Sequence, residues 1–162
     1  VAEVYDKVTF KVKNITLLAN SVQGSYTQGV VAGALPTAGT WAEASTPVTA
    51  NLQVYNDAGF TLTTSEQSLD ATADDYRILL PHAFADTELM EITYDIITNY
   101  TGTPVTEEVT VSKKLSEIFK ETTPASWQAG KKYTLTITLS LNEILWDPAV
   151  EEWATGTGAW GI

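Results

Sequence analysis

The sequence contains no cysteine and only one histidine and one methionine among its 162 residues. The absence of cysteine excludes disulfide bonds, thiol nucleophiles and cysteine-ligated zinc. Catalytic and metal sites need converging titratable groups, and we find no nucleophile elbow, phosphate-binding loop, dinucleotide fingerprint or histidine-pair metal motif. The sequence therefore predicts a protein that is not an enzyme and that carries no cofactor and no metal.

Basic residues are scarce as well, because nine lysines and arginines accompany 20 aspartates and glutamates and give a formal net charge of −11. Such an acidic surface repels nucleic acids and anionic lipids, so neither is expected as a partner. No apolar run is long enough to cross a bilayer as a helix. The sequence begins at Val1 without a recognisable signal peptide, and we interpret it as a processed or excised piece of a longer protein.

The abundant residues are threonines and aromatics, a mixture typical of extracellular β proteins. The clearest pattern covers residues 133–141, where apolar side chains alternate with threonine and serine. Alternation with a period of two places the apolar side chains on one face of a strand and the polar ones on the other. Gly130 predicts the turn that precedes this strand, and Pro148 predicts where it ends.

A second alternating segment covers residues 7–18, and its apolar face changes sides after Asn14. An extra residue that reverses the register is a β-bulge, and bulges and lysines both protect edge strands from unwanted pairing. A strand that ends and restarts at Asn14 is the alternative. We expect an edge strand here, and its apolar residues are the candidate strand-exchange edge: Val8, Phe10, Val12, Ile15 and Leu17.

Shorter patterns predict the remaining elements. Residues 20–47 are rich in glycine and small side chains and predict long loops with one short strand at residues 26–31. The helical spacing of Leu115, Ile118 and Phe119 predicts one short helix near residues 113–120. A hairpin is predicted at residues 52–62 with its turn at residues 56–59, and single strands are predicted at residues 76–80, 89–98 and 105–111.

These seven or eight strands recur at intervals of about ten residues, with turns between them and no βαβ alternation. The pattern predicts an all-β fold, an antiparallel Greek-key β-sandwich, and we expect residues 1–162 to form one such domain. The tail, residues 153–162, is rich in glycine and threonine and cannot carry a core of its own. It is either a flexible terminus or a donor strand.

The second half of the chain resembles the fimbrillin family of the Bacteroidetes, whose members build type V pili. The resemblance covers about half of the chain, residues 76–153, and is vague before residue 62. Upstream it rests on the strand at residues 89–98 and on Leu79-Leu80-Pro81-His82, where His82 departs from an expected glutamine. Downstream it rests on Trp127, Gly130-Lys131-Lys132-Tyr133, Asn142-Glu143-Ile144, Asp147-Pro148 and Trp153.

The resemblance implies a transthyretin-like sandwich, either the carboxy-terminal domain of a fimbrial subunit or a short family member. Family members are exported lipoprotein precursors, which implies a location in fimbriae on the outer membrane. Any lipid anchor, and with it any membrane contact, would belong to a leader outside this sequence. Subunits of the family polymerise by strand exchange, which implies other fimbrial subunits as partners, with host or bacterial surface ligands a further option. The strand at residues 8–18 or the tail, residues 154–162, is expected to take part.

Five tryptophans support an alternative, a carbohydrate-binding module of a surface lipoprotein, because exposed aromatic rings stack on sugars. Trp41 and Trp160, in predicted loop and tail, are the candidate glycan contacts. The other three, Trp127, Trp146 and Trp153, flank the longest strand, where aromatics usually seal the ends of a sandwich.

The single histidine and the acidic clusters could each belong to a functional site or be ordinary structural features. His82 is the single histidine, and a lone histidine at a strand end is usually a surface or turn residue. Calcium binds carboxylate oxygens, but the acidic clusters match no calcium loop and are typical of solvated turns. These clusters are Asp74 with Asp75, and Asp147 with Glu151 and Glu152.

Overall fold

The structure, a computed structural model, describes residues 7–29, 37–69, 77–120, 125–141 and 143–152. These residues form antiparallel strands and one short helix, which confirms the predicted all-β fold. No helix in the described ranges is long and apolar enough to span a membrane. The elements are β1 (Val8–Ser21), β2 (Gly24–Gly29), β3 (Thr37–Glu43), β4 (Thr49–Thr61), β5 (His82–Ala83), β6 (Leu89–Thr98), β7 (Val105–Lys114), α2 (Leu115–Ile118), β8 (Ser126–Trp127), β9 (Lys131–Leu139) and β10 (Ile144–Glu152).

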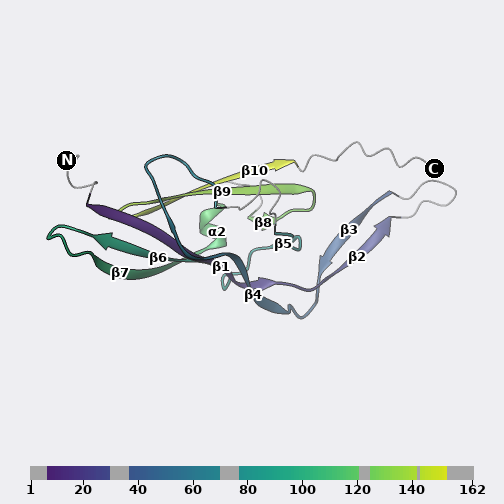
Figure 1. Cartoon of the computed structure of the whole chain (residues 1–162). Helices are drawn as coiled ribbons and strands as arrows, with labels where there is room; N and C mark the ends of the chain where they lie inside the picture. The colour runs from purple at the N-terminus through teal and green to yellow at the C-terminus, as the bar shows by residue number, and fades with distance from the viewer. Residues whose placement is uncertain (1–6, 30–36, 70–76, 121–124, 142, 153–162) are drawn as a thin grey trace.

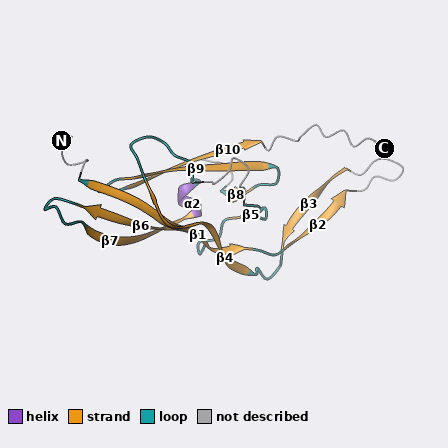
Figure 2. Cartoon of the chain, viewed as in Figure 1, coloured by secondary structure: helices purple, strands orange, loops and turns teal. Residues whose placement is uncertain are grey.

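Two layers make up the main part of the molecule, in a sandwich-like arrangement (Figure 1). The larger layer is a four-stranded antiparallel sheet in the order β4-β1-β6-β7. The chain passes from β4 on one side of β1 to β6 on the other, so neighbours in the sheet are not always neighbours in sequence. The smaller layer is the β9–β10 hairpin, and the short β5–β8 ladder and α2 lie between the two layers (Figure 2).

The core lies between these layers and follows from strand alternation. On β6, Met90, Ile92 and Tyr94 are buried as every second residue, as the pattern predicts. The predicted helix is also confirmed, because α2 buries Leu115 and Ile118 against the sheet. The apolar residues of β9 and β10 that pack on this core are only partly buried: Tyr133, Leu135, Ile137, Leu139, Ile144 and Trp146.

β1 to β4 form two antiparallel ladders that lie end to end, β1 with β4 and β2 with β3. The sequence patterns located parts of β1, β2 and β4 but missed β3 and these pairings. β1 pairs with β4 inside the larger sheet. Beyond this ladder, the segment after β1 forms β2 and the segment before β4 forms β3, and these two strands pair with each other. Backbone bonds join the two halves, from the Val22 N–H to the Val48 carbonyl at 2.9 Å and from the Ala44 N–H to the Gln23 carbonyl at 3.2 Å. Figure 1 shows the β2–β3 half projecting away from the rest of the molecule. We call β2 and β3 the arm, and the remaining elements the body.

Three predicted elements are wrong. Residues 52–62 form no hairpin, because β4 is continuous and residues 57–59 bulge opposite Lys13 of β1. Residues 77–80 form no strand. Residues 37–43, predicted as loop, form β3, while the short strand predicted at residues 26–31 is present as β2 up to Gly29.

Pro148 does not end the alternating strand. It lies inside β10 and pairs with Leu135, and β9 ends earlier, at Leu139. Proline is tolerated in an edge strand because its missing N–H can face away from the ladder. β10 is such a strand within the described residues.

Candidate functional site

The arm leaves the body at the end of β1, where the backbone is irregular. Ala19 has a φ of 53°, in the left-handed region, and its N–H donates a hydrogen bond to Asn51 Oδ1 at 3.0 Å. The register with β4 shifts here. In a regular strand consecutive side chains point to opposite faces, so the bulge explains why Asn20 and Ser21 are both buried.

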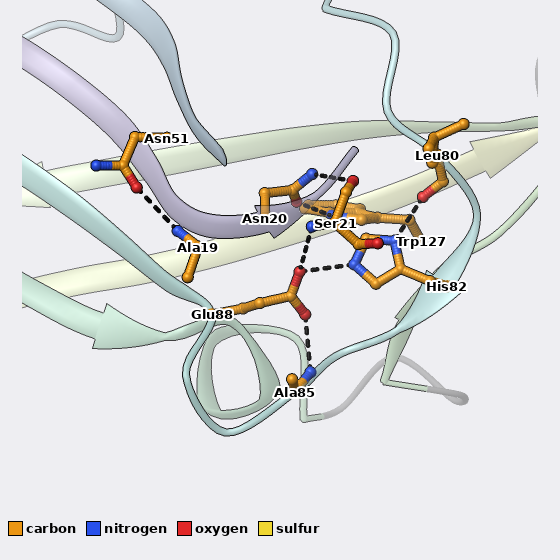
Figure 3. A network of polar contacts seen from close by, with 9 residues as sticks. All are labelled: Ala19, Asn20, Ser21, Asn51, Leu80, His82, Ala85, Glu88 and Trp127. Carbon is orange, nitrogen blue, oxygen red and sulfur yellow. Dashed lines mark hydrogen bonds and ion pairs between the residues drawn. The ribbon is translucent and has the colours of Figure 1, made fainter. Parts of the chain in front are cut away.

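These two buried residues join a polar network that connects β1, β5, the segment before β6 and β8 (Figure 3). Asn20 Oδ1 accepts a hydrogen bond from Trp127 Nε1 at 3.0 Å, and its amide nitrogen donates to the Ser21 carbonyl at 2.9 Å. The Ser21 N–H donates to Glu88 Oε1 at 3.2 Å. We call Asn20, Ser21, His82, Glu88 and Trp127 the arm-base network.

His82 and Glu88 form a buried pair at the centre of this network. Nε2 of His82 lies 2.6 Å from Glu88 Oε1, and each side chain is only 2% exposed. Nδ1 of His82 lies 2.8 Å from the Leu80 carbonyl, and the Ala85 N–H donates to Glu88 Oε2 at 2.7 Å. A carbonyl and a carboxylate can only accept, so this geometry fits an imidazolium that donates from both nitrogens.

The electrostatics support the charged form of the pair. Burial disfavours the imidazolium, but the hydrogen bonds to Glu88 and Leu80 and the charges of Glu88 and Glu43 outweigh it and raise the pKa of His82. Burial also disfavours the carboxylate of Glu88. Hydrogen bonds from His82, Ala85 and Ser21, with the charge of His82, outweigh this effect and lower the pKa of Glu88.

This arrangement suits a structural role rather than proton transfer to a substrate. Both ring nitrogens of His82 are engaged, and the ring is buried, so neither nitrogen faces a substrate. The prediction that His82 is a surface or turn residue is therefore wrong. The pair fixes β5 and the segment before β6 against the end of β1, at the base of the arm.

An aromatic cluster closes the body beside this network. The ring centroid of Trp127 lies 4.9 Å from that of Phe84, 5.2 Å from that of Phe119 and 4.8 Å from that of Tyr133. All three contacts are edge-to-face. Tyr133 Oη donates to the Ser126 carbonyl at 3.0 Å and accepts from the Gln128 N–H at 2.8 Å. Trp127 thus seals one end of the sandwich, as expected from its position, while Trp153 lies outside the described residues.

The arm carries a different kind of aromatic contact. Tyr26 of β2 lies opposite Trp41 of β3, with ring centroids 5.1 Å apart, and both side chains are exposed. Trp41 was predicted in a loop and instead lies in a strand. Trp160, the second candidate glycan contact, lies outside the described ranges, as does the tail.

The predicted strand-exchange edge is not an edge. β1 is hydrogen-bonded to β4 on one side and to β6 on the other, so it is an inner strand of the sheet and residues 11–17 are paired on both sides. The predicted bulge at Asn14 is confirmed, because both registers shift between Val12 and Asn14, but it lies inside the sheet. The five residues are core or near-core: Val12, Ile15 and Leu17 are buried, and Val8 and Phe10 are partly buried.

Apart from the two-residue strands β5 and β8, four body strands have one side without a partner in the described parts of the chain, and three of these carry features that oppose further pairing. β4 has the bulge at residues 57–59, and β10 contains Pro148. β7 carries charged side chains, among them Glu107 and Lys113. β9 begins with Lys131 and Lys132, but beyond them it differs, because its register with β10 has no shift and its residues 133–139 include no charge and no proline.

An open cavity of about 470 Å³ lies between the two layers at their β7 and β10 side. Tyr94 and Val111 of the larger sheet and Ile144 and Trp146 of β10 line it, together with polar residues of the β9–β10 turn. No group of three or more histidine, aspartate or glutamate side chains in the described ranges is placed to hold a metal ion. Asp147 and Glu151 are exposed, and Asp74 and Asp75 fall outside those ranges.

Comparison with protein-family models, with curated proteins and with solved structures finds no match for this chain.

Proposed function

We propose that this chain is a non-enzymatic structural subunit of a fibre on a bacterial cell surface, and that its subunits assemble by β-strand addition. The observation that supports the proposal is the outer edge of β9. In the described structure this edge is long, regular and uncharged from Tyr133 to Leu139 and lacks a second strand partner. Natural proteins normally cover or protect such an edge, so an unprotected one favours pairing with another chain.

The physics of strand addition fits this edge. The main chain of an added strand would bond to the N–H and C=O groups of β9 that face away from β10, and its alternate side chains would extend the apolar layer. The inward row of β9 is only partly buried, so further apolar surface remains to be covered. Five apolar side chains on the added strand, at about 2 kcal/mol each, would contribute about 10 kcal/mol before the cost of ordering the strand.

The resemblance to fimbrillins agrees with this mechanism and supplies the biological setting. It implies export to the outer membrane, other fimbrial subunits as partners, and a lipid anchor carried by a leader outside this sequence. The structure changes one part of the expectation. The receiving edge proposed here is β9, because β1 is an inner strand whose residues 11–17 are paired on both sides.

The test is light scattering on a size-exclusion column across a concentration series, with each oligomer peak then run in SDS without boiling. The wild-type protein should form oligomers that survive SDS and dissociate on boiling. The double variant Thr134→Lys/Thr138→Lys changes two exposed side chains on β9, and lysines on an edge oppose pairing. We expect this variant to be monomeric at every concentration.

The matched control is Thr49→Lys/Thr61→Lys on β4, which also changes two exposed threonines of an edge strand. Both variants change the net charge equally, so a loss of oligomers only in the β9 variant assigns assembly to that edge. A monomeric wild-type protein, or an equal loss in both variants, would contradict the proposal.

A further inference from the structure

One face of the arm presents two aromatic rings side by side. Residues directly opposite each other on paired strands share a face, and Tyr26 pairs with Trp41. Gly24 pairs with Glu43 on the same face, and Gly39 precedes Trp41 by two residues. The aromatic pair is therefore flanked by glycines, and Glu43 is the one charged residue of β2 and β3.

The backbone of Gly39 holds the ring of Tyr26 in place. The Gly39 N–H donates a hydrogen bond to Tyr26 Oη at 2.9 Å. A Cβ atom at position 39 would lie 2.4 Å from Tyr26 Cζ, so any larger residue would displace the ring. The ring is fixed across β3 before any ligand arrives, which reduces the entropy lost on binding. The hydroxyl hydrogen of Tyr26 can still donate to a ligand.

The charge pattern of the chain favours a neutral ligand at this face. Residues 14–42 contain no charged side chain, although the chain as a whole has a formal net charge of −11. A charged partner would be recognised by complementary charges, and the arm offers only Glu43.

The size of the face favours a small ligand over a protein. Tyr26 is 47% exposed and Trp41 is 44% exposed. Fully exposed rings of this kind offer about 150 to 250 Å² each, so the pair presents roughly 200 Å². A specific protein interface buries about 800 Å² on each partner. One or two sugar rings match the smaller area, and their C–H groups suit the negative faces of aromatic rings.

We propose that the Tyr26–Trp41 face of the arm binds an uncharged carbohydrate, with a sugar ring stacked on the two side chains and its hydroxyl groups bonded to Tyr26 and Glu43. This site would give the subunit an adhesive function in addition to assembly. It goes beyond the function proposed above and does not depend on it, because the arm and β9 are separate surfaces (Figure 1).

The test is a titration of the ¹⁵N-labelled monomeric protein by NMR with four neutral disaccharides: cellobiose, lactose, maltose and N,N′-diacetylchitobiose. We expect at least one of them to shift the Trp41 indole N–H signal, with a Kd on the order of 1 mM for so shallow a site. Trp41→Ala should weaken the binding by about tenfold or more. The matched control is Tyr100→Ala, which removes another exposed aromatic and should leave the Kd within about twofold of the wild-type value.

Three results would overturn the carbohydrate site. The first is the absence of any Trp41 shift with all four sugars, and the second is a binding event that Trp41→Ala leaves unchanged. The third is a Trp41 signal that shifts with protein concentration alone, which would identify the face as a contact between copies. The titration uses monomeric protein, for which the Thr134→Lys/Thr138→Lys variant can serve. The two proposals therefore fail separately: a negative sugar titration does not contradict assembly through β9, and a lack of assembly does not contradict sugar binding by the arm.

Discussion

The β1–β4 ladder of the body leads into the β2–β3 ladder of the arm, but the surroundings of the two ladders differ. In the body, β1 is paired on both sides and contributes Val12, Ile15 and Leu17 to the core. In the arm, β2 and β3 pair with each other. Residues 24–29 and 39–43, whose side-chain exposure is described, are all exposed or partly exposed. The difference arises at Ala19–Ser21, where a bulge and the arm-base network end the regular ladder.

This comparison shows where stability and recognition lie in the molecule. The body holds the apolar burial and the buried polar network, so most of the unfolding free energy should come from it. The arm contributes little burial and carries the exposed aromatic pair. A two-stranded ribbon is marginally stable alone, so the arm depends on the body for its anchorage.

The loss of unfolding free energy should differ most between body and arm when one aromatic side chain is removed from each. Phe119→Ala opens a cavity beside Trp127 and Phe84 and should lower the unfolding free energy by about 3–5 kcal/mol. Trp41→Ala removes an exposed ring and should change it by less than about 0.5 kcal/mol. Urea denaturation followed by circular dichroism measures both values. Similar losses would mean that the arm packs on the body more tightly than described.

Breaking the arm-base network should be the next largest effect. Glu88→Gln places an amide nitrogen among donors from His82, Ser21 and Ala85, so at least one buried donor loses its partner. The cost should be about 2–3 kcal/mol in the same denaturation experiment. The control, Glu107→Gln, neutralises an exposed carboxylate on β7 and should change the unfolding free energy by less than about 0.5 kcal/mol.

The same pair predicts a pH dependence whose sign is fixed by the two pKa shifts. The pKa of His82 is raised in the folded state, so its stabilisation is complete below about pH 6.5 and is lost as the pH rises through the folded value. The pKa of Glu88 is lowered, so its stabilisation is present above about pH 4.5 and is lost as the pH falls through the folded value. Between these limits both contributions are present.

The measurement is the unfolding free energy of the wild type minus that of His82→Gln, from pH 4 upward to alkaline pH. We expect this difference to be largest in mildly acidic solution and to fall as the pH rises. A difference that grows with increasing pH would contradict the charged pair.

The smallest effect should follow from removing the arm itself. Replacement of residues 24–43 by a short glycine-containing turn deletes strands that pair mainly with each other. The unfolding free energy of the body should fall by less than about 1 kcal/mol, partly because the shorter loop is cheaper to close. A loss comparable to that of Phe119→Ala would show that body and arm are one cooperative unit.

The sequence predicted those parts of the fold that depend on local pattern. Period-two alternation located β6 and the start of β9, and helical spacing located α2. The same reasoning failed where a local signal has two structural meanings. Residues 56–59 carry turn chemistry, which here serves a bulge within β4, and the small residues of the arm carry no apolar alternation at all.

The remaining errors concern contacts that are distant in sequence. Whether residues 8–18 form an edge depends on β4 and β6, and the pattern of one strand does not specify its partners. The burial of His82 depends on Glu88 and on the end of β1, and no motif marks this combination. For the candidate surfaces, Trp41 was found as an aromatic outside the core strand, whereas Tyr26 and the open edge of β9 required the strand pairing.

Hydrogen–deuterium exchange, compared between monomer and oligomer fractions, tests most directly the claim that body and arm have separate tasks. In the monomer, amides of β1 and β6 should exchange slowly and those of the arm rapidly. In the oligomer, β9 should gain protection while the arm remains unchanged. Protection that appears in β2 and β3 on assembly, with β9 unchanged, would contradict the account, because the arm would then be the assembly surface.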